Sequence, residues 1–293
     1  MKVSLDQLNK AGAQEFVAAL GEIFEHSPWV AERVVTKRPF ANTRALLDAM
    51  TTTVKSASKE EQSALLRAHP DLAGKAARAG ALTKDSTAEQ TSAGLDQLSE
   101  REFESFQGFN ENYQQKHGIP FIICVRRHTK DSILKQFETR IDNSAGHEFE
   151  TALSEVFRIA ALRLDQKIEG ADLGLNGRLS THVLDNHAGR PAKNMWLALR
   201  ELSAGDEPRL IIRVQTNADG RTDAPLISGR PVPAGQYELL FSVADYYRDQ
   251  KVPLAEPPFL DVVPIRFSTA EPEGHYHVPL LVTPWSYSTY RGS

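Results

Sequence analysis

Histidine, arginine and hydroxyl side chains occur in four separated segments of the C-terminal half. These segments hold His182, Arg221, the pair His275 and His277, and the final run Tyr290-Arg291-Gly292-Ser293. An imidazole, with an ordinary pKa of about 6.5, can take up or release a proton at neutral pH, and a guanidinium can hold carbonyl-rich anions in a forked hydrogen bond. Chain ends are usually frayed, so such a tail indicates part of an active site.

A second set of polar residues lies in the N-terminal half, where each one also has an ordinary structural explanation. A proline follows His69, so a helix should end there, and an imidazolium would suit its C-terminal carbonyls. Ser86 and Glu89 have the spacing of a capping box. Arg163 borders an apolar stripe that its aliphatic stem could cover.

Helical periodicity predicts the element type of this N-terminal half. Between residues 5 and 168 apolar positions recur at helical spacing, most clearly from Leu153 through Val156 and Ala160 to Leu164. We therefore predict an all-helical bundle. Its first helix should open at Ser4 or Asp6 and extend to Phe24, and further helices are expected over 42–55, 58–68, 88–97, 99–116 and 130–143.

The pattern changes after Ile168. Residues 169–177 contain three glycines and no periodicity, which is typical of a linker. Short β-like runs such as 209–216 and 237–243 follow, and turns rich in Pro and Gly separate them. We predict an all-β sandwich over 178–293, with one short helix near 244–249 and with His275 and His277 on the same strand face.

The C-terminal motifs resemble the 5-hydroxyisourate hydrolase family, the transthyretin-like enzymes. The similar segments are Leu179–Asp185, Gly189–Ala192, Thr216–Arg221, His275–Leu281 and Tyr290–Ser293. The resemblance implies a seven- or eight-stranded sandwich that forms a homotetramer and hydrolyses 5-hydroxyisourate without a metal. By position it implies His182, Arg221, His277 and Ser293 as catalytic residues, with Tyr290 binding the substrate. We expect the two histidines to activate water and move protons.

The N-terminal motifs resemble the 2-oxo-4-hydroxy-4-carboxy-5-ureidoimidazoline (OHCU) decarboxylase family over about residues 5–168. The segments are His69–Leu72, Ser86–Gln90, Gly118–Ile122 and Ile159–Leu164. This resemblance implies an all-helical, dimeric fold that needs no cofactor and forms (S)-allantoin. It implies that His69 and Glu89 are catalytic residues. It also implies a set of substrate-binding residues, which are Pro70, Ser86, Gln90, Phe121, Ile122 and Arg163.

The two resemblances concern consecutive reactions, so we interpret the chain as a bifunctional enzyme of urate breakdown. Thirty-four Lys and Arg against 38 Asp and Glu do not suggest a nucleic-acid partner, and no apolar run is long enough to predict a membrane span. Small-molecule substrates, a homo-oligomer and a cytoplasmic location are expected. The single cysteine, Cys124, lies in an apolar run and is predicted to be a buried, inert thiol.

Two alternatives remain open from the sequence. The sandwich could bind a hydrophobic ligand without catalysis, as transthyretin does, while the helical half serves as an interaction module. Alternatively, His182, His275 and His277 could bind zinc, since His-x-His on a strand is a known ligand pattern.

Overall fold

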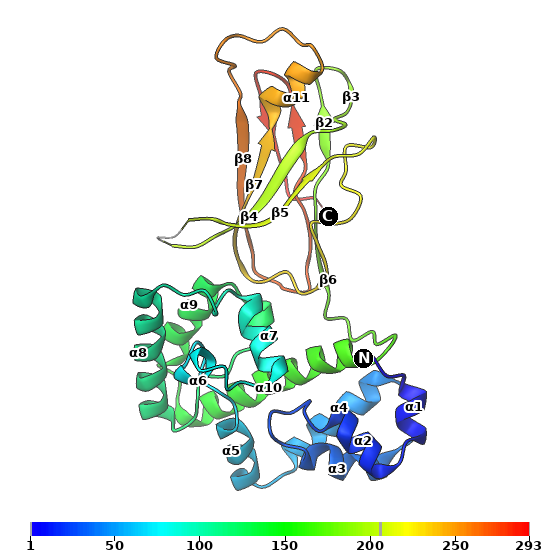
Figure 1. Ribbon diagram of the computed structural model, residues 1–293, viewed down its shortest axis with the longest axis vertical. Coiled ribbons are helices and arrows are strands. Elements are labelled where there is room, and N and C mark those ends of the chain that lie inside the picture. The colour runs from blue at the N-terminus through cyan, green and yellow to red at the C-terminus, as the bar shows by residue number, and fades with distance from the viewer. Residues whose placement is uncertain (1, 205–206, 293) are drawn as a thin grey trace. The chain divides into compact units, whose positions relative to one another are not determined.

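The computed structural model describes residues 2–204 and 207–292 (Figure 1). The chain divides into two compact units. The first comprises Met1–Arg126 and Ile133–Leu175, and the second comprises Arg127–Ser132 and Asn176–Ser293. The first unit is helical and the second consists mainly of strands, so the predicted fold class is confirmed. None of the helices in the described parts of the chain is long and apolar enough to cross a membrane.

The helices of the first unit pack around the long helix α10, which contacts α4 and α5 (Figure 1). Eleven residues of α10 are buried, and the eight apolar ones among them belong to the apolar core. The elements are α1 (Leu5–Lys10), α2 (Ala13–Leu20), α3 (Trp29–Val34), the 3-10 turn η1 (Val35–Lys37), α4 (Thr43–Lys55), α5 (Lys59–Arg67), α6 (Lys75–Arg78), α7 (Lys84–Ser92), α8 (Glu100–His117), η2 (Val125–Arg127), α9 (Lys130–Arg140) and α10 (Ala145–Lys167).

Several helix boundaries follow from local capping. Ser58 and Ser99 form capping boxes at the starts of α5 and α8, and Gly118 ends α8 with a φ of 69°. Two sequence predictions were wrong. The expected first helix is interrupted where Ala11 is extended, which separates α1 from α2. The helix expected at 88–97 instead begins at Lys84, because Thr83 accepts a hydrogen bond from the Ser86 N–H and caps it there.

The second unit contains two facing layers of strands. One layer is a four-stranded antiparallel sheet in the order β5-β4-β7-β8, and the other consists of the smaller sheets β6-β1-β9 and β11-β10-β2-β3. The strands are β1 (Gly177–Ser180), β2 (Val183–Asp185), β3 (Arg190–Pro191), β4 (Trp196–Leu202), β5 (Arg209–Gln215), β6 (Ile227–Arg230), β7 (Gly235–Ser242), β8 (Val262–Thr269), β9 (His275–His277), β10 (Leu280–Val282) and β11 (Tyr287–Ser288).

Alternating residues from both layers form the core of the second unit. Leu179, Val183 and Leu280 come from one layer, and Leu199 and Phe241 come from the other. The predicted short helix is present as α11 (Val243–Asp249). Its two tyrosines donate hydrogen bonds to the buried carboxylate of Asp185 at 2.9 Å each, which fixes α11 against β2. The predicted sandwich is therefore confirmed.

Candidate active sites

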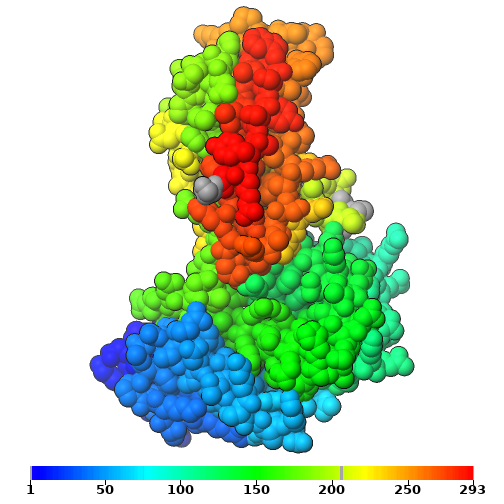
Figure 2. Space-filling model, turned by 180° about the vertical axis from the view of Figure 1, so that it is seen from behind, coloured from blue at the N-terminus to red at the C-terminus, as the bar shows by residue number. Residues whose placement is uncertain are grey.

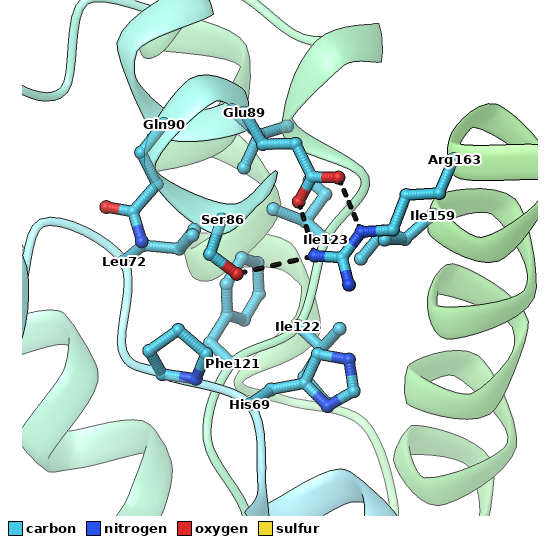
Figure 3. Close-up of a pocket in the computed structure, with 12 residues that line it drawn as sticks. His69, Leu72, Ser86, Glu89, Gln90, Phe121, Ile122, Ile123, Ile159 and Arg163 are labelled. Carbon is cyan, nitrogen blue, oxygen red and sulfur yellow. Dashed lines mark hydrogen bonds and ion pairs between the residues drawn. The ribbon is translucent and has the colours of Figure 1, made fainter. Parts of the chain in front are cut away.

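Helices and one irregular segment bring the N-terminal candidates together around a pocket (Figure 3). His69 follows α5, while Ser86, Glu89 and Gln90 lie on α7. Arg163 projects from α10, and Phe121 and Ile122 come from the extended segment after α8. Pro70 also lines this pocket. Residues that are up to 94 positions apart in the sequence therefore surround one small space.

Arg163 is the central group of this cluster, and only 5% of its surface is exposed. Its Nε and Nη2 donate to the two carboxylate oxygens of Glu89 at 2.9 and 3.0 Å, a forked ion pair. Nη2 also donates to Ser86 Oγ at 3.3 Å (Figure 3). Burial acts to lower the pKa of Arg163, but its acidic neighbours outweigh burial and raise that pKa. The guanidinium is permanently charged.

His69 is a neutral imidazole at physiological pH. It is nine-tenths buried, and this desolvation lowers its pKa to about 4 despite the nearby carboxylate of Glu25. Its Nδ1 lies 3.0 Å from the carbonyl oxygen of Leu65, and because a carbonyl only accepts, Nδ1 must carry the proton. Nε2 is then the unprotonated, basic nitrogen. The interpretation of His69 as an imidazolium that stabilises the helix end is therefore wrong, because burial disfavours the charged form of the imidazole.

Ser86 and Gln90 do not cap a helix. Ser86 lies in the first turn of α7, where its hydroxyl donates to Glu25 rather than to a backbone group. Gln90 is buried, and its Oε1 accepts the N–H of Ala73 at 2.9 Å. The capping-box interpretation of Ser86 and Glu89 is thus wrong, since Thr83 already fills the cap position.

Two buried charged residues, Arg140 and Glu155, bind backbone groups of the extended segment after α8 that lines the pocket. Arg140 Nη1 donates to the carbonyl oxygen of Ile122 at 2.8 Å, and Arg140 itself pairs with the fully buried Glu148. Two residues further along, the N–H of Cys124 donates to Glu155 at 2.8 Å. The Cys124 thiol is buried, as predicted. These contacts satisfy backbone groups that no helix or strand could satisfy here.

The pocket encloses about 30 Å³. Pockets for drug-sized ligands usually enclose roughly 300 Å³ or more. A ring-bearing substrate therefore requires the side chains that line this space to move outwards.

In the second unit, His182 and Arg221 are cross-strand neighbours. They form an isolated antiparallel bridge, and the Val183 N–H donates to the Gly220 carbonyl at 2.8 Å. Gly220 has a φ of 69°, and it permits the tight turn that Asn217 closes by accepting the Arg221 N–H. His182 is half-buried and Arg221 is exposed. Burial and the charge of Arg221 lower the pKa of His182.

His277 is held by two neighbours, Ser180 and Gly292. It pairs with Ser180 in the parallel β1–β9 ladder, and its Nδ1 lies 3.0 Å from Ser180 Oγ. Its carbonyl accepts the N–H of Gly292 at 2.9 Å, so the chain end packs against it. Burial, followed by the charges of Arg221 and neighbouring histidines, lowers the pKa of His277. This influence of Arg221 and His182 on His277 means that the three groups form one cluster.

The remaining candidates of this half lie around His277. His275 is exposed on the strand face that His277 shares, with buried Tyr276 on the other face. Tyr290 lines a cavity of about 220 Å³ together with His277, and its ring is largely exposed. Ser293 lies outside the described residues. In Figure 2 the red C-terminal segment covers part of the visible surface of this unit.

The zinc alternative requires three converging ligands. Across residues 2–204 and 207–292, no three or more His, Cys, Asp or Glu side chains are arranged to hold a metal ion. His182, His275 and His277 do not form such a set.

Family comparisons agree with the division into two units. The OHCU decarboxylase family model matches residues 9–165, and the HIUase/Transthyretin family model matches residues 179–292. The 5-hydroxyisourate hydrolase of Ralstonia nicotianae is 55% identical over 117 residues, which cover 99% of that protein and 40% of this chain. The chain belongs to both families.

Two further relatives support this conclusion. The OHCU decarboxylase of Haloferax volcanii is 46% identical over 166 residues, which cover 96% of that protein and 57% of this chain. A crystal structure of (S)-allantoin synthase is similar over 99% of this chain and all of that one, with 36% identity and a TM-score of 0.51. Along this chain the decarboxylase family match comes first and the hydrolase family match second.

Sequence reasoning missed two residues of these sites. In the decarboxylase unit, Glu25 contacts Ser86 and Arg163, and in the hydrolase unit Ser180 contacts His277. The signal for Glu25 was a carboxylate directly after the apolar pair Ile23-Phe24. The signal for Ser180 was its place two residues before His182, although only the strand pairing shows that it meets His277.

Proposed function

We propose that the chain catalyses two consecutive steps of urate breakdown. The second unit hydrolyses 5-hydroxyisourate to OHCU, and the first unit decarboxylates OHCU to (S)-allantoin. The observation that carries this proposal is the presence of both enzyme families on one chain, since the product of one family is the substrate of the other. The similarity of nearly the whole chain to an (S)-allantoin synthase supports the same conclusion.

In the decarboxylation, the bond between a ring carbon and the carboxylate breaks, and CO2 leaves without its electron pair. The imidazolone ring delocalises that pair. Neutral His69 takes the proton of the substrate hydroxyl through Nε2, because Nδ1 is occupied by the Leu65 carbonyl. The ring carbon that loses CO2 becomes a carbonyl, and the electron pair moves to the neighbouring ring carbon, which bears the ureido group. His69 and Glu89 are the groups able to deliver a proton to one face of that neighbouring carbon, which makes the product a single enantiomer. Solvent supplies the proton that balances the loss of CO2.

The other residues of the decarboxylase pocket bind the substrate. Arg163, Ser86 and Gln90 hold its ureido and ring polar atoms, while Pro70, Phe121 and Ile122 form the apolar wall. The polar groups are already oriented by the protein, so little reorganisation is needed during the reaction. The reaction needs no cofactor, because the ring itself accepts the electron pair.

In the hydrolysis, water attacks a carbonyl carbon of 5-hydroxyisourate, a C–O bond forms and the ring C–N bond breaks. His182 and His277 remove a proton from water and deliver one to the leaving nitrogen, and their lowered pKa values keep the basic form available at neutral pH. Arg221 holds the substrate oxygens. Tyr290, which lines the cavity beside His277, binds the substrate, and the hydroxyl of Ser293 is a further catalytic group of this proposal.

We further propose that residues 1–168 and 178–293 are the two domains, joined by a linker at 169–177, and that the chain forms a homo-oligomer. A tetramer through the sandwich and dimer contacts through the helical part are expected. Trp285 and Tyr287 near the chain end are 58% and 46% exposed, which is typical of an interface. Light scattering coupled to gel filtration tests this expectation, and a monomer at micromolar concentration would contradict it.

The function is tested with untagged protein and freshly generated 5-hydroxyisourate. The ultraviolet decay of the substrate and the circular dichroism of the product are followed together. Fast decay with a lasting (S)-allantoin signal would establish both activities. Decay that stops at OHCU would leave only the hydrolase, and decay no faster than in buffer would favour a binding protein.

A further inference from the structure

Glu25 is a buried carboxylate behind the decarboxylase pocket. It lies in the turn between α2 and α3, and only 1% of its surface is exposed. The next residue, His26, has a φ of 46°, in the left-handed region that non-glycine residues adopt mainly in turns. Removing a carboxylate from water costs several kcal/mol unless it is paired. A carboxylate this deeply buried therefore needs specific partners.

Its partners are groups of the pocket or directly beside it. Thr83 Oγ1 and Ser86 Oγ donate to Oε1 at 2.7 and 3.0 Å, and Arg163 Nη1 lies 2.7 Å from Oε2. Burial acts to raise the pKa of Glu25, but the charge of Arg163 and the two hydroxyls outweigh burial and lower it. Glu25 is therefore an anion in the folded protein.

Hydrogen-bond accounting shows what this anion does to Arg163. Four of the five N–H groups of Arg163 donate to acceptors, two to Glu89, one to Ser86 and one to the Glu22 carbonyl. Glu89 therefore holds the Nε and Nη2 edge, while Glu25 attracts Nη1 from the opposite side. Among the described residues, Oε2 of Glu25 accepts no hydrogen bond of good geometry, and its contact with Arg163 Nη1 at 2.7 Å is an ion pair.

The same accounting fixes the hydroxyl of Ser86. Its single proton points to Glu25, because a carboxylate can only accept. Ser86 Oγ can then only accept hydrogen bonds from its remaining neighbours, as it does from Arg163. Glu25 therefore determines that Ser86 presents a lone pair, which suits a ureido N–H of the substrate.

We propose that Glu25 is a positioning residue of the decarboxylase, which clamps Arg163 against Glu89 and orients the Ser86 hydroxyl towards itself. The proposal rests on the proposed decarboxylation of OHCU. Glu25 does not line the pocket, so it acts on the substrate only through Arg163 and Ser86.

The test compares Glu25→Gln and Glu25→Asp in the full chain. Glu25→Gln keeps the shape and removes the charge, whereas Glu25→Asp keeps the charge and shortens the reach. The control is Glu32→Gln, which removes an exposed carboxylate from the neighbouring helix α3. We measure kcat and KM for OHCU, the enantiomeric excess of allantoin, and the hydrolase rate of the same samples.

If the charge of Glu25 is what matters, kcat should be highest for wild type, lower for Glu25→Asp and lowest for Glu25→Gln. Loss of a hydrogen-bonded charge should lower kcat for Glu25→Gln about 10- to 100-fold, with kcat/KM falling equally and hydrolysis unchanged. If Glu25 has a purely structural role, activity should depend on side-chain shape instead, and Glu25→Gln should be more active than Glu25→Asp. That order, or a Gln variant within twofold of the control, would overturn the proposal.

Folding is monitored by circular dichroism, and the rates are divided by the folded fraction. If Glu25→Gln does not fold, Glu25→Asp decides, because a fall in kcat of about tenfold at unchanged KM supports the role and an unchanged kcat refutes it. A wild-type protein that fails to accelerate decarboxylation would instead refute the proposed function itself, which is a different outcome.

Discussion

His69 and Arg163 in the first unit are at least nine-tenths buried, whereas in the second unit Arg221 is exposed and His182 and His277 are half-buried. Ion pairs arrange the charges of the buried cluster, and burial is the largest cause that lowers the pKa of His69 to about 4. The open cluster depends on strand pairing and the packed chain end for its geometry. The two units therefore fix histidine and arginine side chains in different ways, by desolvation and ion pairs in the first unit and by strand register in the second.

The largest expected difference between the two clusters is in stability. Arg163→Ala leaves Glu25 and Glu89 without their cation and should lower the free energy of unfolding of the helical unit by about 3–5 kcal/mol, with loss of decarboxylation. Arg221→Ala removes an exposed side chain and should change stability by less than about 0.5 kcal/mol while hydrolysis falls. Urea unfolding and both activities are measured, and equal destabilisation by the two variants would contradict the comparison.

The pH dependence of stability should differ between the clusters. An unfolded histidine takes up its proton near pH 6.5, but folded His69 resists protonation down to about pH 4. The unfolded state binds more protons in this window, so stability is full above pH 6.5 and falls by about 3 kcal/mol as the pH decreases to about 4.

His69→Gln should remove this loss, whereas His182→Gln should change the pH dependence much less. The unfolding free energy of each variant is compared with wild type from pH 4 to 8. A difference between wild type and His69→Gln that does not vary with pH would refute the neutral, buried state of His69.

The open site should be sensitive to the packing of the chain end. A Cβ added at Gly292 would lie 2.5 Å from Cδ2 and 3.1 Å from Cγ of His277, so Gly292→Ala must displace the imidazole. A displacement of about 1 Å can reduce the rate about 100-fold, and we expect this for hydrolysis only. Gly108→Ala in α8 is the control, because its added Cβ meets no atom within 4 Å. If Gly292→Ala hydrolyses the substrate at the wild-type rate, the packing of the C-terminal segment does not contribute to the hydrolase site.

The smallest effect is expected at Ser180. Ser180→Ala removes the partner of His277 Nδ1 and should lower the hydrolase kcat about tenfold, the usual order for one net hydrogen bond. Ser180→Thr keeps a hydroxyl and should recover most of that rate. Steady-state hydrolysis and decarboxylation are measured on each variant, and equal rates for Ala and Thr would show that the hydroxyl has no positioning role.

The sequence by itself determined the two fold classes. Helical spacing in 5–168 and short β-like runs after 178 predicted the helices and strands, because each periodicity reports which faces must be buried. The boundaries were less predictable. The break at Ala11 and the cap at Thr83 depend on single local contacts that several neighbouring residues could also have made.

The motifs also nominated His69, Glu89 and Arg163 as one set, but only the tertiary structure decided their physical state. Sequence spacing cannot show that desolvation keeps His69 neutral, or that Glu25 lies against Arg163, 138 positions away. Likewise the parallel pairing of β1 with β9 decided that Ser180 meets His277. Protonation and hydrogen-bond direction depend on burial and on long-range neighbours, and these exist only once the chain has folded.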